Sequence, residues 1–382
     1  MKTRREDPNQ PGKTEIKCRW CVKGFRDPDI YEMNRQSPTL SMEALMVTLQ
    51  ILASNQWLMH IADVEGAFLQ GETLKRKNGR VFVEVTKEDC IVLGIPEGAV
   101  VELVKCVYGL SDAPRAWWES FSKTAQSLGM KQSELDPCVF LWFHENSLQG
   151  ILSLHVDDMV LGGSQKFHEV LVPQLKKKYP FKHWKTKQGM FLGRNLVQQE
   201  DYSIVCDQEE YSRNVQVIKM TKDRRKQKNS PVTENERTKL RGVIGAANWL
   251  MSSTRPDIAV QAGFLQQRIS KATVNDLIEA NRLVGRIKDH SHLRLTIRSI
   301  PLENCMVVVS TDASWSNCED LRSQAGYVIA VTDRRIAHGD QTQLSILRWR
   351  SYKQERHTQS TLGAELMSLA RGSGSDLYWQ SS

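Results

Sequence analysis

Two adjacent carboxylates set between short apolar runs constrain this chain more than any other feature. Residues 152–163 read L-S-L-H-V-D-D-M-V-L-G-G, a pattern that predicts a β-hairpin with Asp157 and Asp158 at or beside its turn. Neighbouring carboxylates repel, and immobilising them is costly unless a cation lies between them. The pair is therefore either a solvated turn, where Asp is common, or part of a divalent-metal site.

A third acid lies upstream, at the end of another apolar run. Residues 60–71 read H-I-A-D-V-E-G-A-F-L-Q-G, with Asp63 followed five residues later by Phe68. Carboxylates from neighbouring strands can hold two metal ions about 3.5–4 Å apart, one activating a 3′-hydroxyl and the other clamping a triphosphate. Magnesium suits such oxygen ligands. The spacing predicts a nucleotidyl-transfer palm, in which Phe68 is either a filter against a sugar 2′-hydroxyl or a plain core residue.

An ordered series of motifs around these acids resembles the copia-type retrotransposon reverse transcriptases. Residues 63–71 are similar to the family's D-V-x-x-A-F-L-x-G, residues 107–117 (V-Y-G-L-S-D-A-P-R-A-W) to its L-Y-G-L-K-Q-A-P-R-x-W, and residues 155–158 (H-V-D-D) to its Y-V-D-D. Its F-L-G and T-R-P-D-I follow at 191–193 and 254–258. The resemblance extends from about Lys17 to about Trp379, which is nearly the whole chain.

This resemblance implies an α+β fold: a right-hand polymerase of fingers, palm and thumb, followed by a truncated α/β ribonuclease H-like domain. It implies RNA-directed DNA polymerase activity, the addition of dNTPs to a primer 3′-hydroxyl on an RNA or DNA template. Asp63, Asp157 and Asp158 would be the catalytic ligands of two Mg²⁺ ions, and Phe68 the sugar filter. His155 replaces the family's Tyr and offers a planar ring to the primer terminus, but adds a titratable group near the metals.

The fingers motif K-A-R-L-V-A-K-G-F resembles residues 17–25, K-C-R-W-C-V-K-G-F. Arg19, and with it Lys17, would then meet the incoming triphosphate. Exposed cations on an edge strand are the alternative. Asp112 stands where the family has Gln, a departure expected to weaken contact with template or nucleotide.

A second acidic unit near the C-terminus resembles the ribonuclease H domain that follows the polymerase in copia-type Pol. Residues 310–315 (S-T-D-A-S-W) and 349–354 (W-R-S-Y-K-Q) are similar to two of its motifs. Asp312 and Glu365 are the matched metal ligands, although each taken alone is an ordinary surface acid. The chain stops at Ser382, before the strand expected to bring a third acid, and Asp376 is a poor substitute. We therefore expect no ribonuclease H activity.

Four segments are predicted: a disordered N-terminus at 1–14, fingers and palm at 15–233, thumb and connection helices at 234–300, and the partial ribonuclease H-like domain at 301–382. Helices are expected at 41–54, with Ser41 as N-cap, and at 114–129, between Pro114 and Gly129. Pro256 is expected to break the later helical region, because proline disfavours helical geometry in the residue before it.

Composition is consistent with a nucleic-acid partner. The 382 residues carry a net charge of +8 and include 40% hydrophobic residues, with basic runs at 176–178 and 222–228 that either follow a template–primer backbone or are solvated faces. Eight cysteines show no disulfide or zinc spacing, and no apolar stretch is long enough for a membrane span. An intracellular location, cytoplasm or nucleus, is expected.

Two other interpretations of the sequence remain open. The chain is alternatively a catalytically inactive retrotransposon relic that binds nucleic acid non-specifically, because the basic surface alone would serve that role. A two-metal nuclease without polymerase activity is the weaker alternative, since the downstream acid set is incomplete.

Overall fold

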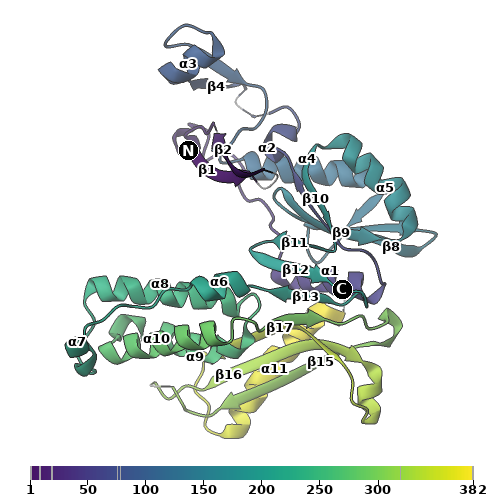
Figure 1. Cartoon of the computed structure of the whole chain (residues 1–382). Coiled ribbons are helices and arrows are strands. Elements are labelled where there is room, and N and C mark those ends of the chain that lie inside the picture. Colours follow the sequence, from purple (N-terminus) through teal and green to yellow (C-terminus); the bar gives the residue numbers. More distant parts are fainter. Residues whose placement is uncertain are drawn as a thin grey trace. The chain divides into compact units, whose positions relative to one another are not determined.

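A computed structural model describes residues 2–7, 10–18, 20–74, 76–77, 79–318 and 320–380, with side chains over residues 20–374 of these. The chain divides into two compact units. One contains residues 1–40, 62–159 and 165–184, and the other contains residues 41–61, 160–164 and 185–382. Figure 1 gives the element labels. These units do not follow the predicted boundaries at 14, 233 and 300.

A six-stranded sheet in the order β10-β3-β9-β8-β7-β6 carries the acids singled out above. Its strands in chain order are β3 (His60–Val64), β6 (Met130–Gln132), β7 (Val139–His144), β8 (Ser147–His155), β9 (Asp158–Gly163) and β10 (Phe181–Thr186). Because β8 and β9 are nearly continuous buried runs, from Gly150 to Leu154 and from Met159 to Gly163, the central hairpin is fixed by apolar burial on both faces.

The first unit contains the helices α2 (Ala67–Gln70), α3 (Lys87–Leu93), α4 (Ala113–Ser127) and α5 (Gln165–Lys178). The predicted helix at 114–129 is confirmed as α4, with Pro114 in its first turn and Gly129 just beyond it at φ +83°. A small sheet of β4 (Val81–Glu84) and β5 (Val100–Leu103) flanks α3.

The N-terminal prediction was wrong. Residues 1–14 were expected to be disordered, but β1 (Lys2–Asp7) and β2 (Gln10–Cys18) pair as an antiparallel hairpin. Thr3, Thr14 and Ile16 have the branched side chains that favour strands. Counting polar residues and prolines overlooked this pairing.

The second unit begins with α1 (Met42–Ser54), where the predicted helix at 41–54 is confirmed. Ser41 Oγ accepts from the Ala44 backbone N–H at 3.1 Å and caps the helix. A four-stranded antiparallel sheet follows in the order β11-β12-β13-β14, made of β11 (Gln188–Phe191), β12 (Arg194–Gln198), β13 (Ile204–Asp207) and β14 (Leu295–Ile297).

Helices α6 (Glu209–Asn214), α7 (Lys222–Lys226), α8 (Glu234–Met251), α9 (Ala259–Arg268) and α10 (Val274–Asp289) separate β13 from β14. Capping boxes start α8, through Thr233 and Glu236, and α10, through Thr273 and Asp276. The predicted break is confirmed, because α8 ends at Met251 and a 3₁₀ turn at Pro256–Ile258 leads into α9. Arg255 is 1% exposed and its Nε lies 2.8 Å from Asp257 Oδ1, which makes this motif structural.

The C-terminal segment forms an antiparallel sheet in the order β15-β16-β17 with one helix against it. The elements are β15 (Cys305–Ser314), β16 (Gln324–Asp333), β17 (Leu344–Lys353) and α11 (Thr361–Gln380). A Cβ on Gly372 of α11 would lie 2.6 Å from Thr311 Cγ2 of β15, so the helix and sheet approach closely there. No helix in the described part of the chain is long and apolar enough to span a membrane.

Candidate active site

The turn between β8 and β9, Val156 and Asp157, is the centre of the candidate site, and we call it the acidic turn. Asp157 lies in the turn and Asp158 is the first residue of β9, as the sequence predicted. Val156 has φ +58°, a left-handed conformation that is a genuine outlier for a β-branched residue. Surrounding contacts must therefore hold this turn against its own backbone preference.

Asp63 lies beside the acidic turn. It is the fourth residue of β3, the neighbour of β9 in the sheet, and the N–H of the next residue, Val64, donates to the backbone carbonyl of Asp157 at 2.9 Å. This bond ties the peptide that follows Asp63 to the peptide that carries Asp157. Two segments almost a hundred residues apart in sequence thus meet where β3 ends and β9 begins.

The charges of Asp157 and Asp63 act on the carboxyl group of Asp158. Burial, followed by the charges of Asp157 and Asp63, raises the pKa of Asp158 to about 6. All three side chains are partly buried, so their repulsion is less screened than it would be in water. The sequence prediction that these acids lie close together agrees with this geometry.

Oxygen-only donors of this kind suit magnesium, which takes carboxylates together with water and phosphate oxygens. Across residues 20–374, however, no three His, Cys, Asp or Glu side chains form a group arranged to hold a cation. Electrostatic coupling extends over longer distances than metal ligation, so the two observations are compatible. The three acids therefore supply oxygen donors of the kind that a divalent cation takes.

Trp117 of α4 holds the acidic turn through a hydrogen bond. Its indole Nε1 donates to the backbone carbonyl of Val156 at 2.5 Å, and the side chain is 1% exposed. The ring packs among Phe121 and Tyr179, at centroid distances of 5.8 and 5.4 Å. The sequence marked Trp117 only as part of a motif, and its bond to the turn was not predicted.

Phe68 lies just after the N-terminus of the short helix α2, partly buried against the cluster of Leu103, Cys106, Leu110 and Ala113. Its ring meets that of Tyr108 edge-on, with centroids 5.2 Å apart. This packing supports the core interpretation and leaves the filter role open, because a filter must itself be held rigidly. His155, the last residue of β8, directly precedes the acidic turn and is half-buried.

The segment after Arg19 docks on the Y-G-L motif. The Val22 N–H donates to the Tyr108 carbonyl at 2.9 Å, and a Cβ on Gly109, where φ is +94°, would lie 2.1 Å from the Val22 carbonyl oxygen. Only glycine fits this approach. Arg19 itself lies outside the described residues, as does the side chain of Lys17, whose backbone belongs to β2.

Sequence reasoning missed a buried ion-pair network that includes Asp112 of the motif at residues 107–117. Arg76 is only 6% exposed in its side chain and pairs with Asp27 at 2.5 Å, Asp112 at 3.0 Å and Asp29 at 3.7 Å. Burial alone would lower the pKa of Arg76, but the hydrogen bonds and charges of Asp27 and Asp112 outweigh it and raise that pKa. The Asp at position 112 therefore has a structural partner.

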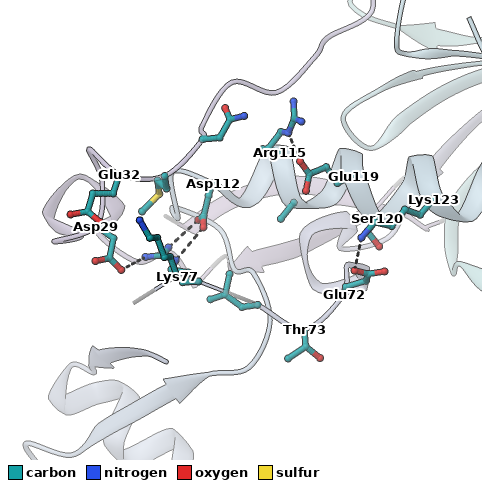
Figure 2. Close-up of a pocket in the computed structure, with 15 residues that line it drawn as sticks. Asp29, Glu32, Glu72, Thr73, Lys77, Asp112, Arg115, Glu119, Ser120 and Lys123 are labelled. Atoms are coloured by element: carbon teal, nitrogen blue, oxygen red, sulfur yellow. Dashed lines mark hydrogen bonds and ion pairs between the residues drawn. The ribbon is translucent and has the colours of Figure 1, made fainter. Parts of the chain in front are cut away.

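A cavity of about 420 Å³ adjoins this network (Figure 2). Asp112 and Asp29 face it from one end, and at the other end Lys123 pairs with Glu72 at 3.1 Å. Arg115, whose Nε lies 2.6 Å from Glu119 Oε1, lines the wall. Since these cations are matched by carboxylates, the cavity has no strong preference for an anion.

The C-terminal acids are neighbours on different elements. Glu365 of α11 accepts at Oε1 from the Ala313 backbone N–H, 3.2 Å away, one residue after Asp312 of β15. The Ser368 hydroxyl donates to the Asp312 carbonyl oxygen at 3.1 Å. Asp376 falls in α11, and its side chain lies outside the described residues.

The predicted basic runs differ in how far they are neutralised. Lys176, Lys177 and Lys178 end α5, and Lys176 Nζ lies 4.2 Å from the Trp184 ring centroid. In the later run, Arg224 pairs with Glu236 at 2.8 Å. That run is therefore partly structural, since Glu236 also belongs to the capping box of α8.

Known proteins resemble the chain across most of its length. A family model described as reverse transcriptase (RNA-dependent DNA polymerase) matches residues 2–234, which include Asp63, the acidic turn and Trp117. The retrovirus-related Pol polyprotein from transposon TNT 1-94 of Nicotiana tabacum is 27% identical over 67% of this chain and 22% of its own length. The polyprotein from transposon RE2 of Arabidopsis thaliana is 23% identical over 95% of this chain and 24% of its own.

The transposon Ty1-JR2 Gag-Pol polyprotein of Saccharomyces cerevisiae is 23% identical over 86% of this chain and 20% of its own length. The chain thus spans 20% to 24% of these relatives. A prototype foamy virus protease-reverse transcriptase crystal structure has 11% identity, a TM-score of 0.29, and covers 98% of this chain and 61% of its own; that score is too low to support a conclusion about the fold. Because the family model matches more than half of the 382 residues, the chain belongs to the reverse transcriptase family, in its copia-type retrotransposon branch.

Proposed function

We propose that this chain is an RNA-directed DNA polymerase that adds dNTPs to a primer 3′-hydroxyl on an RNA or DNA template. The observation that carries the proposal is the meeting of Asp63 with the acidic turn, seen in the Val64-to-Asp157 bond and in the raised pKa of Asp158. A carboxyl group whose pKa is shifted by burial and by nearby charges is a candidate functional group.

Asp63, Asp157 and Asp158 would hold two Mg²⁺ ions, which when bound supply an activated primer hydroxyl and neutralise charge on the triphosphate and leaving group. The protein's own part is positional. Trp117 and the Val64 N–H hold the two carbonyls of the acidic turn, at 2.5 and 2.9 Å. With a pKa of about 6, Asp158 is mainly ionised at neutral pH, the form that binds cations.

Substrate selection would come from residues around this centre. Phe68, held edge-on by Tyr108, would exclude a 2′-hydroxyl by steric contact. Lys17 and Arg19 would meet the triphosphate. The bond from the Val22 N–H to the Tyr108 carbonyl supports this role, because the Tyr108 ring also contacts Phe68. His155, directly before the acidic turn, would lie against the primer terminus.

The remaining segments would bind template and primer. In this proposal residues 15–233 form fingers and palm, residues 234–300 form the thumb and connection, and residues 301–382 form a ribonuclease H-like domain with Asp312 and Glu365 as metal ligands. The lysines that end α5 would contact backbone phosphates, because salt-dependent phosphate contacts dominate nucleic-acid affinity.

Primer extension tests the proposal. Purified chain, poly(rA) template, oligo(dT) primer, dTTP and Mg²⁺ are combined, and Asp157→Asn and Asp158→Asn are compared with Asp223→Asn. Asp223 is 86% exposed in its side chain and pairs with Lys226 on the same short helix, so it is a matched surface control. We expect extension by the wild type and the control, and a loss of at least about a thousandfold in the two turn variants.

The relic alternative gives a different result in the same samples. Template–primer binding, measured by fluorescence anisotropy, would persist without extension in the wild type. Retained binding with no extension by the wild type would refute the polymerase proposal. Equal extension by wild type and Asp158→Asn would show that polymerisation does not use the acidic turn.

A further inference from the structure

A cavity of about 610 Å³ in the second unit is lined by charged side chains of only one sign. It lies among the start of α1, the end of α8, one side of α9 and strand β17. Its charged lining residues are Arg194, Arg348, Arg350 and Lys353, and no Asp or Glu is among the residues that line it. A cavity of this size is within the range that holds small ligands.

Arg194 is a buried cation that has no carboxylate partner among the residues that the structure describes. It is 5% exposed, its two terminal nitrogens donate at 3.0 Å to the Leu192 carbonyl and to Ser253 Oγ, and its guanidinium lies 5.2 Å from the Trp249 ring centroid. Its Nε has no hydrogen-bond acceptor among the described residues. Burial lowers the pKa of Arg194, because a buried charge lacking a counter-ion is unfavourable.

The other three cations are compensated unequally. Arg348 pairs with Glu43, and Lys353 pairs with Asp320 at 2.9 Å. Arg350 is exposed and lies 5.7 Å from the Tyr352 ring centroid, with no ion pair to any described carboxylate. Burial, and then the charge of Arg350, lower the pKa of Arg348. After pairing, Arg194 and Arg350 leave the cavity with excess positive charge that an anion would relieve.

Uncharged groups suited to a nucleoside line the same cavity. Gln267 Nε2 donates to Gln324 Oε1 at 3.1 Å, and Gln324 Nε2 donates to Ser351 Oγ at 2.8 Å. Trp349 is half-buried beside them, with its indole nitrogen bonded to the Met251 carbonyl at 2.6 Å. Aromatic and amide side chains next to cations are a combination that binds a base as well as a phosphate.

We propose that this cavity is a second phosphate-binding site, separate from the acidic turn, which accepts the phosphate of a nucleotide-sized ligand at Arg194 and Arg350. A free nucleotide and the phosphorylated 5′ end of a strand carry the same chemistry. The site goes beyond the proposed polymerase function, because it uses none of Asp63, Asp157 and Asp158.

Isothermal titration calorimetry in EDTA tests the site without metal and without catalysis. The full chain is titrated with dATP, with pyrophosphate, and with a 12-mer DNA strand bearing either a 5′-phosphate or a 5′-hydroxyl. Arg350→Gln is the main variant because its side chain is exposed and its loss spares the core. Arg241→Gln is the matched control, since Arg241 is exposed on α8 of the same unit and lines none of the cavities described above.

We expect wild type and Arg241→Gln to bind equally, and Arg350→Gln to bind at least about tenfold more weakly. Preference for dATP and pyrophosphate assigns the site to free nucleotide, whereas preference for the 5′-phosphate over the 5′-hydroxyl strand assigns it to strand ends. Either supports the site. Arg194→Met, a substitution of similar length, should weaken binding further where circular dichroism shows it folded.

Two results would overturn the proposal: no binding of any of the four probes by the wild type, or equal binding by wild type and Arg350→Gln. Neither depends on polymerisation. A chain that fails primer extension but shows Arg350-dependent binding would refute the proposed function and leave this site standing.

Discussion

Replacing Trp117 with Phe should loosen the acidic turn and lower catalytic turnover more than it lowers substrate affinity. The indole Nε1 is the donor to the Val156 carbonyl, at 2.5 Å, and the side chain is 1% exposed. Phe keeps most of the ring but has no donor. The turn would then have to keep φ +58° at Val156 without this bond.

The magnitude follows from two contributions. Leaving a buried carbonyl without its donor costs about 1–3 kcal/mol. We take about 1 kcal/mol here, because Val156 is half-buried and water can replace the indole. A void of about 40 Å³, at about 24 cal/mol per Å³, adds about 1 kcal/mol. The free energy of unfolding should fall by about 2 kcal/mol, which lowers the unfolding midpoint of a unit this size by roughly 4–8 °C.

Catalysis should be affected more than stability. A displacement of about 1 Å at a reacting centre can reduce rate by about a hundredfold. We therefore expect kcat for dTTP incorporation to fall by about ten- to a hundredfold at 25 °C, with KM changed by less than about threefold. Steady-state primer extension, run well below the unfolding midpoint, separates these two parameters.

Trp118 supplies the control. Its indole also donates to a backbone carbonyl, that of Pro137 at 3.2 Å, but does not touch the acidic turn. Trp118→Phe should leave kcat within about twofold of wild type. Incorporation of benzothienylalanine at 117, which keeps the shape and removes the N–H, should reproduce the kcat loss of Trp117→Phe. Wild-type kcat in a destabilised Trp117→Phe would show that the residue serves packing alone.

Three further outcomes are expected. Phe68→Val should raise rNTP relative to dNTP incorporation, because the filter acts by steric exclusion, and an unchanged ratio in an active variant would make Phe68 a core residue. Arg76→Met should lower the free energy of unfolding of the first unit by about 3–5 kcal/mol in urea, because it leaves buried carboxylates without their counter-ion. Arg80→Met, at a side chain that is 74% exposed, should change that free energy by less than about 0.5 kcal/mol. Hydrogen bonding from Arg224 lowers the pKa of Glu236 to about 2, so its stabilisation is complete above about pH 4.5 and lost as pH falls towards about 2; a Glu236→Gln variant with the same acid-unfolding curve as wild type would contradict this.

Local sequence patterns predicted local structure well. The acidic hairpin, the Ser41 cap, the Pro114 start of α4 and the break at Pro256 all follow from a few neighbouring residues whose backbone preferences agree. The meeting of Asp63 with Asp157 was also predicted, first from the spacing of the acids and then from the resemblance between ordered motifs.

Contacts that depend on tertiary geometry were missed. Trp117 and Val156 are 39 residues apart, and Arg76 and Asp112 are 36 apart. Nothing in either local pattern specifies the partner, and the departure at Asp112 gained its explanation only once Arg76 was placed beside it. The N-terminal hairpin was missed for a different reason. Its two strands are mostly polar, so their sequence lacks the alternation of apolar and polar residues that indicates a strand.

Counting bound Mn²⁺ by electron paramagnetic resonance tests the central claim that Asp63, Asp157 and Asp158 form one two-metal site. The full chain is titrated in the presence of template, a dideoxy-terminated primer and dTTP, with Asp63→Asn and Asp223→Asn beside the wild type. We predict two protein-dependent Mn²⁺ ions per chain for the wild type and for Asp223→Asn, and loss of at least one in Asp63→Asn. Equal stoichiometry and affinity in wild type and Asp63→Asn would contradict the account, because Asp63 would then lie beside the acidic turn without sharing its cations.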